Sequence, residues 1–262
     1  MTRLLIVNAD DLGYDPAVTR GILEAMRDGI VTSATFMVNG PHSQDAANRA
    51  RALGSERGAP LALGLHLNLA RWRPCSDAIP SGLLDTSDEL VEANAARLPP
   101  EAVMREVLAQ LARHRDLLGA PATHVDVHKH LHRHPNVLEG LCTALSSREA
   151  RDAHGGRVLP VRSTDAQMRS TLRARGIPTN DHFIGDAGAE AYWTPERLRE
   201  HLSEGALEEG VTELMCHPGH APEFVRSGYS AQREAELRTL TSEEARGWVT
   251  ASGARLADFR AL

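Results

Sequence analysis

A run of histidines in the middle of the chain is the first feature that could do chemistry. The segment THVDVHKHLHRHP, residues 123–135, holds five of the 13 histidines of the chain within eleven residues. His124, Asp126 and His128 alternate with valines, so in an extended strand their side chains would lie on one face. A face of imidazoles and a carboxylate implies a polar cavity, a metal or solvent. An exposed histidine-rich tract is the alternative, but clustered histidines favour a metal site.

Distances limit how many of these histidines can bind one ion. Ligands lie about 2.0–2.2 Å from a Zn²⁺ ion, whereas a strand from His124 to His134 would span roughly 33 Å. The strand should end near His128, because the charged side chain of Lys129 would be costly to bury on the opposite face. His128 is therefore the expected ligand, and His130 is its nearest competitor.

Polar residues also follow three other apolar runs, in LLIVNADD, LALGLHLN and ELMCHPGH. The carboxyl ends of parallel strands meet at one edge of a sheet, where α/β proteins build active sites. We therefore expect Asp10, Asp11, His66 and His217 to converge on the histidine run, although they are far apart in the sequence.

These residues suggest a division of roles. Asp11, His66 and His128 offer one carboxylate and two imidazoles, which is the pattern of a catalytic rather than a closed structural metal site. The donor set suits Zn²⁺, Fe²⁺, Co²⁺ or Mn²⁺ and, with more waters, Mg²⁺. Asp10 could take a proton from water, and His217 could protonate a leaving group.

Four further residues are expected to support the ligands or to contact a substrate. Asp126 precedes His128 on the same strand face and could orient an imidazole. Arg162 closes the apolar run RVLPVR and could keep a neighbouring carboxylate ionised by charge pairing. Asn68 and His130 complete this group, while His132 and His134 are expected in a loop or at the rim.

Short apolar runs alternate with helical patterns along the chain, as they do in β/α units. Strands are expected in RLLIVN, SATFMVN, LALGLH, HVDV, RVLPVR and TELMC, and helices over residues 16–28, 42–53, 101–118, 135–147, 166–175 and 231–240. About seven such units predict an α/β fold with a parallel, barrel-like sheet, and an open doubly wound sheet is the alternative. The long loops 71–98 and 219–229 are expected to form walls or lids over the site.

Composition bounds the class of protein. A chain of 262 residues, 42% hydrophobic and 24% charged, predicts one globular domain over residues 1–262. The net charge of −6 argues against nucleic-acid or anionic-membrane partners. The apolar stretch Leu4–Val7 is too short for a signal peptide or a membrane span. Three cysteines without CxxC spacing predict no disulfide framework, so a cytoplasmic location is expected.

Five motifs resemble, in order, those of the YdjC-like carbohydrate deacetylase family, which includes chitooligosaccharide deacetylases. They are LLIVNADDLGY, GIVTSATFMVNG, LGLHLNL, THVDVHKHLHRHP and ELMCHPGH, and they run from the first strand to about His220. The resemblance implies a distorted β/α barrel related to the NodB-type polysaccharide deacetylases. Family members are expected to read DSHHH where this chain reads DVHKH, so Lys129 departs from the family pattern. The ligand His128 is kept, but the family's substrate contacts at that edge do not carry over to this chain.

The resemblance also implies roles for site residues. One divalent ion, Zn²⁺ or Mg²⁺ with Co²⁺ or Mn²⁺ as alternatives, would be held by Asp11, His66 and His128. Asp10 would act as general base and His217 as general acid in hydrolysis of an acetylated amino sugar or short oligosaccharide, giving acetate and a free amine. A homodimer is also implied.

Two rival functions stay open at this point. The first is a metallohydrolase of the same fold that acts on another amide or on a phosphoester. The second is a non-catalytic metal-binding protein, for which the histidine run itself would be the functional part.

Overall fold

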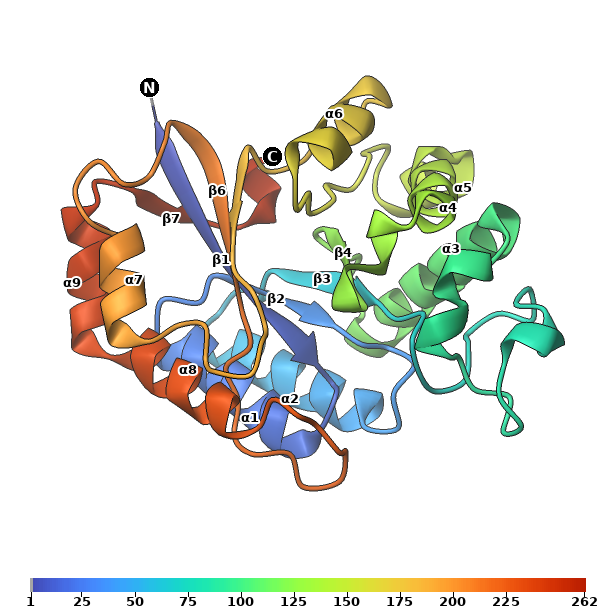
Figure 1. Cartoon of the computed structure of the whole chain (residues 1–262), viewed down its shortest axis with the longest axis horizontal. Coiled ribbons are helices and arrows are strands. Elements are labelled where there is room, and N and C mark those ends of the chain that lie inside the picture. Colours follow the sequence, from blue (N-terminus) through green and yellow to red (C-terminus); the bar gives the residue numbers. More distant parts are fainter. Residues whose placement is uncertain (1) are drawn as a thin grey trace.

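A parallel sheet curled into a distorted barrel forms the centre of the molecule (Figure 1). The computed structural model describes residues 2–262. Within them, seven strands run in the order β4-β3-β2-β1-β6-β5, with β7 also pairing with β1. The strands are β1 Arg3–Leu12, β2 Ser33–Phe36, β3 Leu63–Leu67, β4 Val125–Val127, β5 His182–Ile184, β6 Gly210–Cys216 and β7 Arg255–Ala257. The predicted barrel-like α/β fold is confirmed.

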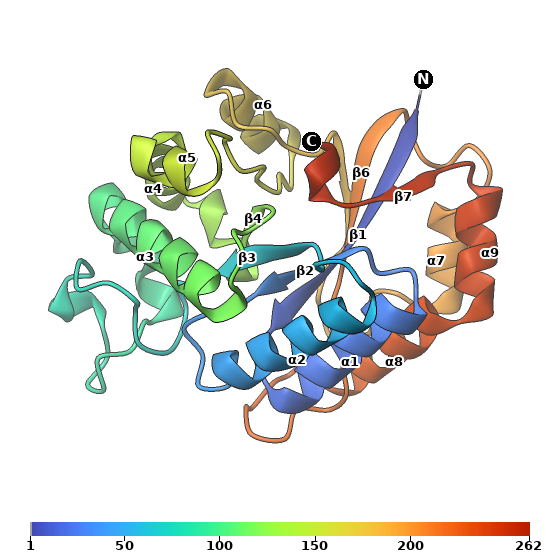
Figure 2. The ribbon, with the colours of Figure 1, turned by 180° about the vertical axis from the view of Figure 1, so that it is seen from behind.

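Helices cover the outside of this sheet, as the views from both sides show (Figures 1 and 2). Four of them begin with a proline at the first helical positions, where a missing N–H costs nothing. The helices are α1 Pro16–Asp28, α2 Ser43–Glu56, α3 Pro100–Leu118, α4 Pro135–Ser146, α5 Arg148–Ala153, α6 Ala166–Ala174, α7 Pro195–His201, α8 Ala231–Thr241 and α9 Glu243–Ala251. Short 3₁₀ helices lie at η1 Ser81–Leu83, η2 Glu92–Arg97, η3 His128–Arg133 and η4 Phe259–Ala261. No helix within residues 2–262 is both long and apolar enough to cross a membrane.

The central strand β1 explains why the first motif is apolar and then polar. On one side it pairs with β6 from Arg3 to Ala9. On the other side it pairs first with β7 and then, from Asn8 onward, with β2. Leu5, Ile6 and Val7 are fully buried, as expected for a parallel strand covered on both faces. The polar residues that follow lie at the carboxyl edge of the sheet.

The expected strand RVLPVR is not among the seven, and this prediction was wrong. Only Val161 forms a bridge, in parallel with Val125 of β4. Pro160 has no N–H and therefore interrupts a regular ladder. The amide of Val125 still donates to the Pro160 carbonyl at 2.8 Å, and the amide of Val161 donates to that of Pro178 at 2.9 Å. This extended segment thus links β4 to the residues before β5 and continues the curl of the sheet.

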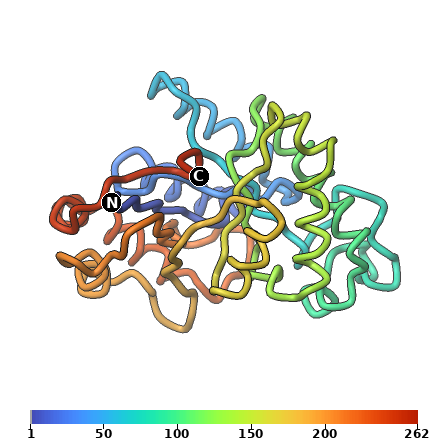
Figure 3. Tube along the Cα trace, turned by 90° about the horizontal axis from the view of Figure 1, so that it is seen from above, coloured from blue at the N-terminus to red at the C-terminus, as the bar shows by residue number. Residues whose placement is uncertain are grey.

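The two long loops are tied to the body of the fold by buried carboxylates. Glu106 of α3 is fully buried and accepts the backbone N–H groups of Cys75 and Ser76, both at 2.8 Å. Asp15, before α1, anchors the loop 219–229, because its carboxylate accepts three backbone N–H groups of that loop. Seen from above, the loop 71–98 lies at the outer edge of the molecule, in teal (Figure 3). Its Arg71 and residues 226–229 of the other loop line the cavity at the carboxyl edge.

Candidate active site

The two aspartates at the end of β1 face one cavity because the strand is irregular there. The pairing of β1 with β2 changes register between Ala9 and Leu12. Asp11 has a φ of 72°, in the left-handed region that residues other than glycine seldom adopt. In a regular strand the side chains of Asp10 and Asp11 would point to opposite faces. Here both line a cavity of about 490 Å³, a size typical of small-molecule sites.

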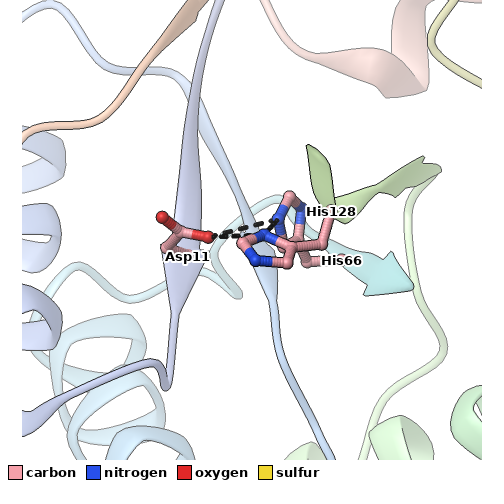
Figure 4. Close-up of side chains that lie close together, drawn as sticks. All are labelled: Asp11, His66 and His128. Carbon is pink, nitrogen blue, oxygen red and sulfur yellow. Dashed lines mark hydrogen bonds and ion pairs between the residues drawn. The ribbon is translucent and has the colours of Figure 1, made fainter. Parts of the chain in front are cut away.

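Asp11, His66 and His128 bring three metal-ligating atoms together (Figure 4). Oδ1 of Asp11 lies 3.2 Å from Nε2 of His66 and 3.2 Å from Nδ1 of His128, and the two nitrogens are 3.0 Å apart. Ligands of a tetrahedral Zn²⁺ ion would be roughly 3.3 Å apart. Oδ1 is buried and has no well-oriented donor within residues 2–262. Because buried acceptor atoms repel one another unless a proton or cation lies between them, this donor set fits a divalent metal.

Asp126 orients the first of the two imidazoles. Its Oδ1 lies 2.6 Å from Nδ1 of His66, and its Oδ2 accepts the Thr35 hydroxyl at 2.9 Å. The opposite ring nitrogen, Nε2, is therefore the one that faces Asp11, an arrangement common among metal-binding histidines. Burial lowers the pKa of His66, but the carboxylates of Asp126 and Asp11 outweigh it and raise that pKa to about 10. The site favours a positive charge at this position.

The strand β4 ends next to His128, as the sequence predicts. β4 stops at Val127, and Lys129 and His130 have φ values of 55° and 53°. This left-handed turn carries His128 into the cavity, while the Lys129 ammonium pairs with Glu92 of η2. Burial lowers the pKa of His128, against the opposing effect of Asp11. The neutral imidazole is the form that binds metals.

Arg162 is fully buried and holds carboxylates from three strands. Its two terminal nitrogens each donate to one oxygen of Asp10 at 2.7 Å, and its Nε donates to Glu213 of β6 at 2.7 Å. Its Nη1 also lies 3.0 Å from Oδ2 of Asp126. Burial raises the pKa of Asp10, but Arg162 outweighs it and keeps that pKa well below its usual range.

A second cluster that could hold an ion consists of Asp10, His66 and Asp126. Arg162 already contacts both of its carboxylates, so each of them has a cationic partner, whereas Oδ1 of Asp11 has no hydrogen-bond donor within residues 2–262. Burial raises the pKa of the third carboxyl on Arg162, Glu213, to about 8. Of the two clusters, the one at Asp11 is therefore the better candidate for a metal ion.

His217 follows β6 and lines the same cavity. Its Nε2 lies 3.9 Å from Oδ2 of Asp10. Its backbone N–H donates to the buried Glu236 of α8 at 2.6 Å, and its ring packs edge-on against Tyr229 with centroids 5.5 Å apart. The imidazole is thus held close to the carboxylate of Asp10, the other residue for which the sequence predicts a proton-transfer role.

Other predicted residues lie at different distances from the cavity. His130 lines it and packs edge-on against Phe183. Asn68 is buried and donates to Asn39 and to the Arg71 carbonyl, so it braces the loop 71–98. His132 is fully buried rather than at the rim, which corrects its expected position.

Sequence reasoning missed Arg233. This residue lies in the first turn of α8, and its guanidinium donates to Oδ2 of Asp11. Burial raises the pKa of Asp11, but Arg233 together with the two histidines keeps that pKa well below the usual range. No motif around Arg233 distinguishes it from the other arginines, because only the packing of α8 brings it to the site.

Known proteins resemble this chain over nearly its whole length. Residues 4–251 match the family model described as YdjC-like protein. The chain belongs to the YdjC-like family. This YdjC-like chain is 34% identical over 265 residues to a carbohydrate deacetylase of Geobacillus stearothermophilus, covering 99% of the chain and 98% of that protein. It is 32% identical over 267 residues to a chitooligosaccharide deacetylase of Salmonella typhimurium, covering 99% of each.

A solved structure shares the whole fold. A protein of Enterococcus faecalis, whose description names cellobiose-phosphate cleavage, superimposes on the YdjC-like chain with a TM-score of 0.81 at 28% identity. The match covers 100% of this chain and 99% of that one. The family resemblance inferred from the five motifs is confirmed.

Proposed function

We propose that this protein removes the acetyl group from an N-acetylated amino sugar or short oligosaccharide by metal-assisted hydrolysis. The observation that carries the proposal is the facing set of Asp11, His66 and His128, with the Asp10 carboxylate and His217 in the same cavity. Full-length similarity to proteins named carbohydrate deacetylases supports the substrate class.

Asp11, His66 and His128 would hold the cation, for which Zn²⁺, Mg²⁺, Co²⁺ and Mn²⁺ are the candidates. A divalent metal there would polarise the acetyl carbonyl and make a nearby water more acidic. Asp126 keeps the His66 ring oriented for this role, because it holds the ring nitrogen that faces away from Asp11.

Asp10 takes the proton from the attacking water. Both oxygens of its carboxylate are fixed by Arg162, so the group is charged and rigidly oriented. The low pKa that Arg162 imposes makes Asp10 a weak base for ordinary water. An acidified water reduces this mismatch, which is why the proposal requires both the ligand set and Asp10.

His217 gives a proton to the nitrogen of the leaving amine. The water oxygen bonds to the acetyl carbon, the C–N bond breaks, and the products are acetate and a free amine. A proton then has to pass from Asp10 back to His217, and the 3.9 Å between Oδ2 and Nε2 is short enough for a small movement or one bridging water.

Acetate release from N-acetylglucosamine oligomers tests the proposal, with Asp10→Asn as the matched variant. We expect wild-type protein to release acetate and Asp10→Asn to lose about 10²–10⁴-fold in kcat, because proton removal is lost. The variant should retain its metal content, because Asp10 is not a ligand.

Turnover of a chromogenic phosphate ester without acetate from any acetylated sugar would favour the rival phosphoesterase. Several ions per chain and no hydrolysis would favour the non-catalytic metal-binding protein. A single domain over residues 1–262 and a homodimer stay predictions.

A further inference from the structure

Arg233 contacts the oxygen of Asp11 that the histidines leave free. Its Nη2 forms an ion pair with Oδ2, and each of the two side chains is only 4% exposed. Oδ1 of the same carboxylate faces His66 and His128. Because a guanidinium already holds Oδ2, Asp11 presents one oxygen, and not two, to an ion.

The fold keeps Arg233 in this position. Its backbone carbonyl accepts the Gly219 N–H at 3.2 Å. This bond fixes the first turn of α8 against the end of the ELMCHPGH motif, which follows β6. Its guanidinium lies 5.5 Å and 5.9 Å from the ring centroids of Tyr14 and Tyr229. Its Nε and Nη1 are buried and find no acceptor among residues 2–262, so Asp11 is the acceptor that holds the group. The ion pair is therefore a built feature of the site.

The charge of the donor set affects the binding of two classes of cation differently. The donor set contains one carboxylate, Asp11, and two imidazoles, and Arg233 balances the carboxylate charge. Mg²⁺ binds mainly through oxygen ligands and depends on their negative charge. Zn²⁺ and Co²⁺ bind imidazole nitrogen well and depend less on the carboxylate.

We propose that Arg233 sets the metal selectivity of this site by weakening Mg²⁺ binding more than Zn²⁺ binding. The inference rests on the proposed function, since it takes Asp11, His66 and His128 as the ligands. Arg233 acts through Asp11 and is a positioning residue, so its effect belongs in cation affinity and does not depend on turnover.

Calorimetric titration of metal-free protein with Zn²⁺ and, separately, Mg²⁺ tests the proposal. In Arg233→Gln we expect the ratio of the Mg²⁺ to the Zn²⁺ dissociation constant to fall by at least about tenfold. This is the size of the change in metal affinity that follows when a residue hydrogen-bonded to a metal ligand is replaced. Arg233→Lys keeps the positive charge and should keep the wild-type ratio. Arg226→Gln is the matched control, because it removes an exposed cation from the same cavity wall while Arg233 still holds Asp11.

An unchanged ratio in Arg233→Gln would overturn the inference, including the case in which both cations weaken equally. If Arg233→Gln does not fold, Arg233→Met gives the same comparison, because it fills the space between the two tyrosines without a charge. Acetate release is measured on the same samples. If the ratio falls in Arg233→Gln as expected but the wild-type protein releases no acetate, the proposed function is contradicted and this inference still stands.

Discussion

The proposed role of His217 as proton donor can be tested separately from the rest of the site by comparing substrates with different leaving groups. Its ring is held by Tyr229 and its backbone by Glu236, so a small polar replacement should leave the surrounding structure in place. An amide nitrogen must be protonated as it leaves, whereas a nitrophenolate leaves without a proton.

His217→Asn should therefore lower kcat for an N-acetylated sugar by about 10²–10⁴-fold. It should change hydrolysis of nitrophenyl acetate by less than about tenfold, because that reaction needs no general acid. Parallel kcat measurements on the two substrates check this, with near-ultraviolet circular dichroism to compare the folded states. An equal loss on both substrates would show that His217 acts otherwise, for example by holding Asp10.

At the scale of residues, strand ends predicted more of the site than any other signal. Asp11, His66 and His128 could be chosen because each follows an apolar run, and such ends meet at one sheet edge. Arg233 could not be chosen in this way, because it comes from a helix after a long loop. Its position depends on the packing of α8, which no local pattern encodes.

At the scale of elements, the loop 219–229 depends on Asp15. Oδ1 of this fully buried residue accepts the Ala17 N–H at 2.8 Å and so caps α1. Oδ2 accepts the backbone N–H groups of Glu223, Phe224 and Val225 at 3.1, 2.8 and 3.1 Å. One carboxylate thus joins the start of α1 to a wall of the cavity.

Asp15→Ala should lower the free energy of unfolding by roughly 2–4 kcal/mol, because a helix cap and a charged anchor for three amides are lost together. Ser147→Ala is a suitable control, since Ser147 caps only α5 and should cost about 1 kcal/mol. Urea unfolding measures both. Hydrogen exchange should accelerate at residues 223–225 in Asp15→Ala alone, and unchanged exchange there would contradict the anchoring role.

The elements that sequence patterns missed are short or lack a clear apolar face. β5 has three residues, all only partly buried, and the three residues of β7 are mostly exposed. In RVLPVR the apolar pattern correctly marked an extended segment, but Pro160 prevented a ladder from forming. Longer and mostly buried strands such as β1 and β6 carried patterns strong enough to be found.

At the scale of the whole molecule, buried histidines should make stability depend on pH. His114 of α3 is 1% exposed and packs against the ring of Phe36 of β2. Burial lowers its pKa to about 4. Below the unfolded pKa of about 6.5 the unfolded chain gains this proton first, so the contribution of His114 is lost as pH falls from about 6.5 toward 4.

His114→Gln removes this titration. Between pH 7 and pH 5 the unfolding free energy of the wild-type protein should fall by about 2 kcal/mol more than that of the variant. Urea unfolding at the two pH values measures the difference. Between pH 7 and pH 8 His114 is mostly neutral in both states, so the two proteins should change nearly in parallel. A parallel change down to pH 5 as well would contradict the assignment.

The position of Arg162 has a consequence for how the proposed activity could be lost in evolution. One guanidinium at the centre of the barrel pairs with carboxyl groups from β1, β4 and β6, so replacing Arg162 would leave buried carboxylates without their cation. Residues at the cavity wall, such as His217, carry no such structural burden. We therefore expect descendants of this fold that abandon hydrolysis to lose the wall residues first and to retain the charged centre as an inherited structural remnant.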